Sequence, residues 1–315
     1  MPSFTLLAAV LLIAYANGAN ANFKGVASLF GSGTTSYRTA VIWAAVTTAA
    51  GCVAATFLSA TMLKAFSGKG LVPDALIVQP TFLAAVAVAT GVAGILATRY
   101  GFPVSTTHML TGALLGAGMI AGEVNVGGLW ETFLKPLLLS PVLAVAAGSV
   151  LYLILKGMRL APDHRTKLLD ALHFLSAGAV CFARGLNDTP KIVALLLSLS
   201  WLHGDAGFYL VTVAMAAGGL ISAKQVAETL SHKITGMNPG QGFAANFATA
   251  LLVTTASVHG LPVSTTHVSV GALLGIGITT GQAKWRTVLP VLAAWVITLP
   301  VSALTAACLY LIFPK

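Results

Sequence analysis

The sequence predicts an all-α protein with several membrane spans, built from two homologous halves. Three observations lead to this fold class. Only 8% of the 315 residues are charged while 57% are hydrophobic, and the mean hydropathy is +0.90. Apolar stretches of about 20 residues, the length that crosses a bilayer as a helix, recur from end to end. Two motifs also occur twice along the chain, which indicates an internal duplication.

Composition excludes several classes of protein. A soluble protein needs far more surface charge than this chain offers. The formal charge is +9, but the basic residues are scattered between apolar blocks, so we expect no nucleic-acid partner. Cys52, Cys181 and Cys308 each lie in an apolar run without paired spacing, which predicts small buried side chains rather than disulfides or a zinc site.

Ten apolar segments are candidate membrane spans. They comprise about residues 4–21, 38–62, 80–98, 104–121, 133–155, 168–184, 206–223, 241–258, 264–280 and 287–313. No Lys or Arg precedes the first segment as in a signal peptide, so we expect it to be retained as a span. Segments 104–121 and 264–280 follow a Pro-Val pair and are rich in glycine, which is more typical of re-entrant hairpins than of plain spans.

The most hydrophilic stretch, residues 156–170, divides the chain almost in half. Its excess of Lys and Arg predicts a cytoplasmic position. We therefore expect a first transmembrane repeat over residues 1–160 and a second over residues 161–315, which together form a single domain.

The strongest internal repeat is a hexapeptide. Residues 103–108 read PVSTTH, and residues 262–267 repeat all six letters after an offset of 159. The string GALLG follows both copies, at residues 112–116 and 271–275. Chance does not produce this match, so the chain is a tandem duplication. By analogy with transporters we expect the two copies to have inverted topology.

The repeated hexapeptides are candidate anion ligands. Where a hairpin enters the membrane, hydroxyls and the free N–H groups of a helix start converge at one depth, and the helix dipole adds partial positive charge. Helix capping explains a single copy better, but capping needs only one residue of a permissive set, whereas six consecutive residues match here. The six hydroxyl donors are Ser105, Thr106, Thr107, Ser264, Thr265 and Thr266.

A second pair of motifs, residues 17–24 and 184–191, is offset by 167 and aligns Lys24 with Lys191. Their Gly, Asn and Pro residues disfavour a continuous helix, so we expect freed backbone groups around a cavity at mid-membrane. Ionisable side chains inside a bilayer are costly, which makes Lys24, Asp188 and Lys191 candidate functional residues. The alternative is that the lysines snorkel from the ends of spans.

His108 and His267 end the two hexapeptides and are candidate proton carriers, since histidine titrates nearest neutral pH. Structural histidines held by hydrogen bonds are the alternative. The sequence shows no nucleophile elbow, phosphate-binding loop or metal-ligand helix motif. We therefore expect no enzyme activity, no cofactor and no metal.

With these motifs the sequence resembles the inorganic phosphate transporter family, the PiT group of secondary carriers, which also includes bacterial sulfate permeases. The resemblance rests on the doubled PVSTTH followed by Gly-Ala, and on the family's doubled Gly-Ala-Asn-Asp signature at residues 18–21 and 185–188. It implies two inverted repeats, each with a hairpin, around a central oxyanion site coupled to sodium or protons. The resemblance assigns to that site Asn20, Ser105, Thr106, Thr107, Asn187, Asp188, Ser264, Thr265 and Thr266.

Departures from the family pattern concern the coupling ion. Ala21 stands where the family has aspartate, and Lys24 and Lys191 stand where it has asparagine. The resemblance thus implies that two ammonium groups replace sodium ions, which leaves proton-coupled or sodium-independent uptake. Asp188 accepts a hydrogen bond from protonated phosphate but repels fully ionised sulfate, so phosphate is favoured and a sulfate permease is the alternative.

The expected setting is a bacterial inner membrane, where the chain is an integral protein. Its expected partners are the lipid bilayer, inorganic phosphate or sulfate, and a coupling proton, with the use of sodium doubtful and a homodimer left open. An anion-selective channel is the rival from another class, because it would share the hydroxyl ligands and the fixed lysines.

Overall fold

The computed structural model describes residues 2–122, 124–159, 166–202 and 205–313. Within these ranges the regular elements are helices, and strand-like pairing is limited to two isolated bridges, Lys69 with Val72 and Thr235 with Ala283. The predicted all-α class is confirmed.

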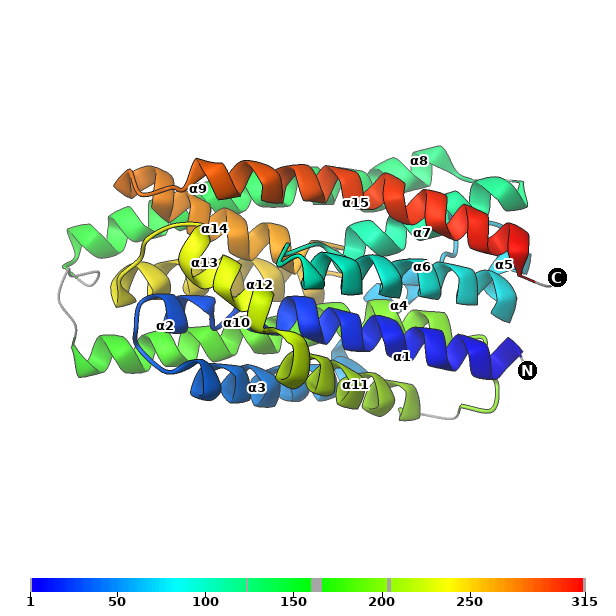
Figure 1. Ribbon diagram of the computed structural model, residues 1–315, viewed down its shortest axis with the longest axis horizontal. Helices are drawn as coiled ribbons and strands as arrows, with labels where there is room; N and C mark the ends of the chain where they lie inside the picture. The colour runs from blue at the N-terminus through cyan, green and yellow to red at the C-terminus, as the bar shows by residue number, and fades with distance from the viewer. Residues whose placement is uncertain (1, 123, 160–165, 203–204, 314–315) are drawn as a thin grey trace.

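Within the described residues, ten long helices lie roughly along the long axis of the molecule, one in each segment that the sequence offers as a span (Figure 1). They are α1 (Pro2–Ala21), α3 (Tyr37–Leu58), α6 (Pro80–Arg99), α7 (Thr106–Ala121), α9 (Lys135–Gly157), α10 (Lys167–Val193), α11 (Ala206–Ser222), α13 (Pro239–Val258), α14 (Thr265–Thr280) and α15 (Trp285–Ile312). Short α-helices connect them, namely α2 (Ala27–Gly31), α4 (Ala60–Phe66), α5 (Asp74–Ile77), α8 (Val126–Leu129) and α12 (Lys224–Glu228). Two 3₁₀ turns, η1 (Asn22–Lys24) and η3 (Ala194–Leu196), and two π-helical turns, η2 (Trp130–Leu134) and η4 (Thr229–Lys233), complete the chain order.

The dimensions and surface of the helices are those of an integral membrane protein. Six helical stretches in the described part of the chain are long and apolar enough to cross a membrane, and the bent pair formed by α11 with α12 and η4 raises this number to seven. Large apolar side chains cover the outside, among them Phe57, Val296 and Ile312, which are 80%, 73% and 75% exposed. A surface with so many exposed apolar side chains requires lipid rather than water around it.

Helices α7 and α14 are shorter than a bilayer. Each has 16 residues. At 1.5 Å per residue this is about 24 Å, less than the roughly 30 Å of a hydrocarbon core. Helix α7 lies with α6 in the half of the molecule that holds the chain termini, and α14 lies with α13 in the other half (Figure 1). Re-entrant hairpins stay a prediction that these lengths favour.

Helices that are equivalent by sequence run in opposite directions. Helix α1 begins at the end of the molecule that holds the termini, whereas α10 begins at the far end (Figure 1). Helices α9 and α15 show the same opposition. This arrangement is the one expected of an inverted repeat, which we keep as our interpretation of the duplicated motifs.

The two halves interlock at glycines. A Cβ atom on Gly18 of α1 would lie 1.9 Å from the carbonyl oxygen of Met215 in α11. The equivalent Gly185 of α10 would place a Cβ 2.3 Å from the carbonyl oxygen of Thr48 in α3. Since neither crossing leaves room for a side chain, helices of one half pack directly on the backbone of the other half.

One expectation about the second motif pair is wrong. Residues 17–24 do interrupt the helix, because α1 ends at Ala21 and a 3₁₀ turn follows. Residues 184–191, however, lie inside a continuous α10. The helix survives because Pro190 lies near its last turn, where its missing N–H removes only the bond to the carbonyl of Leu186.

A second correction concerns the cysteines. Cys52 and Cys181 are buried as expected, but Cys308 is exposed on the outer face of α15. A thiol is small and apolar enough to face lipid. The predicted boundary between the repeats, at residues 160 and 161, lies outside the described residues.

Candidate functional site

Helices α6 and α7 form one helical hairpin and α13 and α14 another, and the tips of these hairpins, residues 103–107 and 262–266, touch each other through a reciprocal pair of hydrogen bonds. Thr107, in the first turn of α7, donates its hydroxyl to the carbonyl oxygen of Val263 at 3.4 Å. Thr266, in the first turn of α14, donates to the carbonyl oxygen of Val104 at 2.6 Å. Both pairs are related by the offset of 159, so the duplicated hexapeptides meet in the folded protein.

The serines of the two hexapeptides are helix caps. Ser105 accepts a hydrogen bond from the N–H of His108 at 3.2 Å, and Ser264 accepts one from the N–H of His267 at 3.2 Å. Each serine therefore fixes the start of its helix. Ser105 and Ser264 are two of the six expected anion ligands, and both act as helix caps, as the alternative interpretation of the hexapeptide predicts.

Lys24 lies inside the protein at the contact between the tips. Its side chain follows the 3₁₀ turn that ends the first motif and is only 3% exposed, so it does not snorkel to a surface. The ammonium group donates to the carbonyl oxygen of Val104 at 3.3 Å and to the hydroxyl of Thr266. Its two bonds thus reach a carbonyl before α7 and a hydroxyl of α14.

Lys191 occupies the equivalent place on the other hairpin tip and is fully buried. Its ammonium group donates to the hydroxyl of Thr107 and to the carbonyl oxygen of Val263, both at 2.9 Å. It also bonds the side-chain oxygens of Asn187 and Asp188, the latter at 3.1 Å. Every one of these partners is an oxygen atom.

Asp188 is the carboxylate at the centre of the site. It accepts hydrogen bonds from Asn17 at 3.1 Å and from the hydroxyl of Thr265 at 3.4 Å. Asn17 also donates to the hydroxyl of Thr106 at 2.8 Å. This carboxylate therefore joins α1, α10 and the tip of α14 while it pairs with Lys191.

Arg184 is a member of the site that the sequence did not single out. It lies one helical turn before Asp188, with its Nε 3.8 Å from a carboxylate oxygen, and it is 1% exposed. Its other nitrogens donate to the side chains of Asn17 at 2.5 Å, Asn22 at 3.3 Å and Thr48 at 3.2 Å. Its position at the start of the second motif was the available signal.

Asn20 and Asn187 brace the hairpins instead of facing each other. Asn20 donates to the hydroxyl of Thr98 at 3.0 Å and accepts from the N–H of Val104 at 2.9 Å. Asn187 donates to the hydroxyl of Ser257 at 2.8 Å. Each asparagine thereby ties the incoming helix of a hairpin to the helix that carries its motif.

The buried charges of the site do not cancel. Among the described residues the buried charged side chains are Lys24, Arg184, Asp188 and Lys191. Three cations against one carboxylate leave a formal excess of two positive charges. An uncompensated charge away from water is strongly unfavourable, whereas a bound anion would balance it.

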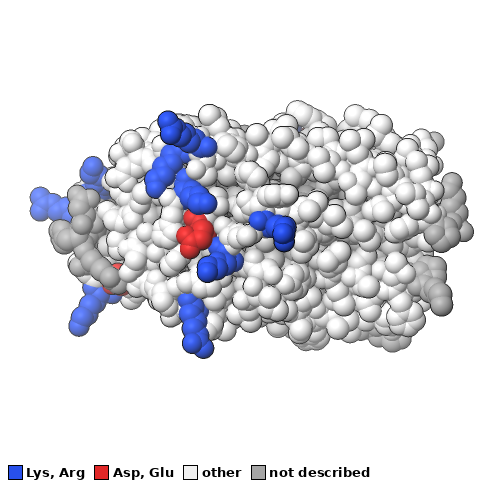
Figure 2. Space-filling view, in the orientation of Figure 1, with Lys and Arg blue, Asp and Glu red and all other residues white. Residues whose placement is uncertain are grey.

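Most lysines and arginines on the visible surface lie over the half of the molecule that contains α2, α13 and α14, one more lies near the middle, and none is seen between it and the end that holds the termini (Figure 2). The positive-inside rule would make this half the cytoplasmic one, and that orientation stays a prediction. The expected cytoplasmic stretch at residues 156–170 begins in this half, although residues 160–165 lie outside the described part.

The two motif histidines form a pair of their own. His108 and His267 have ring centroids 4.6 Å apart, and His267 stacks on Trp295 at 4.0 Å. His267 donates from Nδ1 to the carbonyl of Leu137 at 3.2 Å, while His108 Nδ1 and His267 Nε2 are buried without a hydrogen-bond partner. Within the described ranges, no group of three or more His, Cys, Asp or Glu side chains is placed to hold a metal ion.

Comparison with known proteins agrees with the fold and shows the family. The model of the phosphate transporter family matches residues 17–306. A protein named probable low-affinity inorganic phosphate transporter from Rhizobium meliloti is 29% identical over 97% of this chain and 94% of its own. One of the same name from Bacillus subtilis is 28% identical over 98% of this chain and 96% of its own.

The fold also matches a solved structure described as the sodium-dependent phosphate transporter. The TM-score is 0.87 at 20% sequence identity, over 99% of this chain and 98% of the other. Since the family model spans nearly the whole sequence, both hexapeptides and both lysine-bearing motifs lie within the match. The chain belongs to the phosphate transporter family.

Proposed function

We propose that this chain is a secondary permease for inorganic phosphate and that the anion binds among the hairpin tips. The observation that carries the proposal is the buried formal excess of two positive charges on Lys24, Arg184 and Lys191 against Asp188. A hydrogen phosphate dianion would balance that charge. Threonine hydroxyls and amide groups around it supply neutral hydrogen-bonding groups, which suit a ligand that must also leave.

The two lysines support transport without sodium. Each ammonium group is surrounded by hydroxyl, carbonyl or side-chain oxygens. Oxygen-only surroundings are what a hard metal cation takes. A lysine therefore supplies a fixed charge where a mobile cation would otherwise bind, and a proton gradient remains as the driving force. The related solved structure is described as a sodium-dependent transporter, so the coupling ion is the point on which this chain differs in our proposal.

Asp188 supports phosphate over sulfate. At neutral pH phosphate still carries a proton that a carboxylate can accept in a hydrogen bond, whereas sulfate has none. Both Lys191 and Arg184 lie against this carboxylate, so its charge is partly offset. For this reason sulfate is the competitor to test.

The proposed mechanism is alternating access in the plasma membrane of a bacterium. Inverted repeats offer two similar routes to a central site, one from each side of the membrane. The hairpin tips and the lysines alternate their contacts as one bundle moves against the other. A homodimer is compatible with this mechanism but is not needed for it.

Uptake into proteoliposomes tests the proposal. Labelled phosphate and labelled sulfate are offered under separate sodium and proton gradients, with each unlabelled anion as competitor. We expect phosphate uptake in choline buffer, driven by a proton gradient and saturable. Strict dependence on sodium would overturn the account of the lysines, and failure of labelled phosphate to show counterflow would indicate a channel instead.

A further inference from the structure

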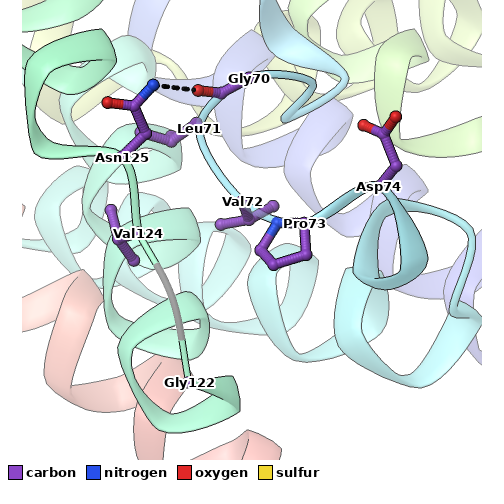
Figure 3. A pocket seen from close by; sticks show the side chains of 8 residues that line it. All are labelled: Gly70, Leu71, Val72, Pro73, Asp74, Gly122, Val124 and Asn125. Atoms are coloured by element: carbon purple, nitrogen blue, oxygen red, sulfur yellow. Dashed lines mark hydrogen bonds between the residues drawn. The ribbon is translucent and has the colours of Figure 1, made fainter.

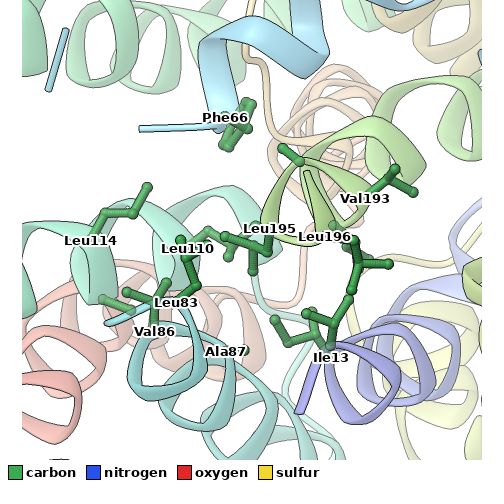
Figure 4. Packing of buried hydrophobic residues seen from close by; sticks show 14 of the residues in the cluster. Ile13, Phe66, Leu83, Val86, Ala87, Leu110, Leu114, Val193, Leu195 and Leu196 are labelled. Carbon is green, nitrogen blue, oxygen red and sulfur yellow. The ribbon is translucent and has the colours of Figure 1, made fainter. Parts of the chain in front are cut away.

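The ring of Phe66 covers Lys191 from one side of the site. Its centroid lies 5.5 Å from the ammonium nitrogen, within the range of a cation–π contact. Phe66 packs edge to face on Phe133 with centroids 5.2 Å apart, and the two side chains are 1% and 2% exposed. Phe66 also belongs to the apolar cluster drawn in Figure 4. The rings of Phe66 and Phe133 therefore shield the ammonium group of Lys191 on this side.

A pocket lies directly outside this aromatic pair. It has a volume of about 270 Å³, and Thr61, Lys64 and Ala65 of α4 line it together with Phe133. One helix thus lines the pocket and, at its last residue, places a ring over Lys191. The exposed ammonium groups of Lys64 and Lys69 at this pocket attract anions.

A second, larger pocket of about 570 Å³ is drawn in Figure 3. It adjoins the first, because both are lined by Gly70 and Leu71. Asn125 closes one side of it. The amide of Asn125 donates to the carbonyl of Gly70 at 3.0 Å, and its backbone N–H donates to the carbonyl of Leu71 at 2.9 Å. The chain after α4 is therefore anchored to the loop before α8.

Helix α4 has a backbone break at each end. Ser59 separates it from α3 with a φ of −120°, outside the helical range. On the other side Gly68 and Gly70 have φ values of 86° and 80°, in the left-handed region that glycine adopts without strain. In the proposal below, the seven-residue helix turns about these two breaks while Gly70 stays in place.

We propose that α4 is the gate between this pocket and the anion site, and that Phe66 is the gating ring. The inference rests on the proposed function. Phe66 holds Lys191 while the site is closed, and an arriving anion competes for the same ammonium group, because an ion pair is stronger than a cation–π contact. The ring then leaves Phe133 and opens the way from the pocket.

The other end of the molecule contains a larger cluster of packed rings. There the rings of Phe23, Phe30 and Tyr37 pack on one another with centroids 5.2 to 5.9 Å apart, and His232 packs on Phe30 at 4.9 Å. Phe23 directly precedes Lys24 in the sequence. A single aromatic pair on one side against several rings on the other makes the α4 side the thinner gate.

Access of a thiol reagent to the site tests the gate. Thr107→Cys places a thiol beside Lys191 in a chain whose Cys52, Cys181 and Cys308 are replaced by alanine. A membrane-impermeant, negatively charged methanethiosulfonate is applied to either face of oriented vesicles, and Lys64→Cys in a parallel sample identifies the face of the pocket. We expect Phe66→Ala to speed labelling of the introduced thiol about tenfold from that face alone.

Phe82→Ala is the matched control. Phe82 is equally buried, packs edge to face on Tyr310 at 5.5 Å and belongs to the same apolar cluster, so its removal leaves a similar cavity away from Lys191. Unchanged labelling in this control, together with slow labelling restored by Phe66→Trp, supports the gate. No acceleration in Phe66→Ala, or acceleration from the opposite face, overturns it.

The same samples separate the gate from the transport proposal. Inorganic phosphate should slow labelling at the introduced thiol by occupying the site. Uptake of labelled phosphate by Thr107→Cys first shows that this variant still binds the anion; if Phe66→Ala then speeds labelling but phosphate never protects the thiol, the gate stands and the assignment of the anion site fails. If phosphate protects the thiol but Phe66→Ala has no effect, the site stands and the gate is wrong.

Discussion

Lys191 and Thr107 lie 2.9 Å apart, measured from Nζ to Oγ1, although they belong to different halves of the duplicated chain. Lys24 and Thr266 form the equivalent bond across the same contact. An anion that draws either ammonium group towards itself weakens a bond between a helix of one half and the hairpin tip of the other. Occupancy of the site is thereby linked to the packing of the halves, as a ligand-driven change of state requires.

Removing the charge of Lys191 should abolish most of the transport. We expect Lys191→Asn to lower phosphate uptake by about tenfold or more, because several charge-assisted hydrogen bonds at the hairpin contact are lost. Lys24→Asn should have a similar effect. Uptake of labelled phosphate in choline buffer measures both variants.

Lys167→Asn is the control for these variants, since Lys167 is exposed at the start of the same helix as Lys191.

Combining Lys24→Asn with Ala21→Asp should make uptake respond to sodium. Full sodium-independent activity of Lys191→Asn would contradict the role of the lysine as a substitute for a cation.

Neutralising Asp188 should change the choice of anion. In Asp188→Asn the amide donates as well as accepts, so it no longer favours an anion that carries a proton. We expect phosphate uptake to fall and competition by sulfate to rise about tenfold. Asp205→Asn, which changes an exposed carboxylate, serves as the control. An unchanged ratio of the two anions would remove Asp188 from the account of selectivity.

Variants of His108 and His267 distinguish a role as proton carriers from a role in packing. We expect His108→Gln and His267→Gln to reduce uptake driven by a pH gradient while counterflow of labelled phosphate at equal pH continues. Counterflow needs only binding and the movement of the loaded protein. His259→Gln, on an exposed turn, is the control. An equal loss in both assays would assign the pair to packing.

Glycine at the helix crossing should be needed for stability. Gly18→Ala places a Cβ 1.9 Å from the carbonyl oxygen of Met215, so α1 and α11 have to separate. We expect a loss of roughly 1–3 kcal/mol, the usual result of overpacking, seen as a lower apparent melting temperature in detergent. Gly157→Ala should cause no loss, because no atom lies within 4 Å of its added Cβ.

The helices were predictable because apolar length is a local property. Every candidate span contains a helix, and the short α7 and α14 coincide with the glycine-rich segments. The continuous course of α10 through Gly185 and Pro190 was not predictable from propensity. Gly185 is present for its contact with Thr48, and this contact between distant parts of the chain has no local signature.

The site was predictable where it is duplicated. The repetition of both the hexapeptide and the lysine-bearing motif indicated that they act together, and each lysine bonds a threonine of a hexapeptide. Arg184 was missed because its repeat partner is Asn17, so comparison of the two halves conceals it. Its hydrogen bonds to Asn17 and Thr48 cross 167 and 136 residues of sequence. Phe66 was missed because an isolated aromatic residue in an apolar protein has no distinguishing pattern.

The glycine crossings also bear on how the protein is made. Helix α3 leaves the ribosome with a glycine, Gly51, that fits against the carbonyl of Phe182, and α9 carries Gly148, which fits against Ala272. During synthesis these faces remain in lipid until more than a hundred further residues have been added. The first half therefore stays without its packing partners until the second half has been synthesised and inserted. Two half-chains made separately, but inserted in the same membrane, have the complementary surfaces needed to find each other.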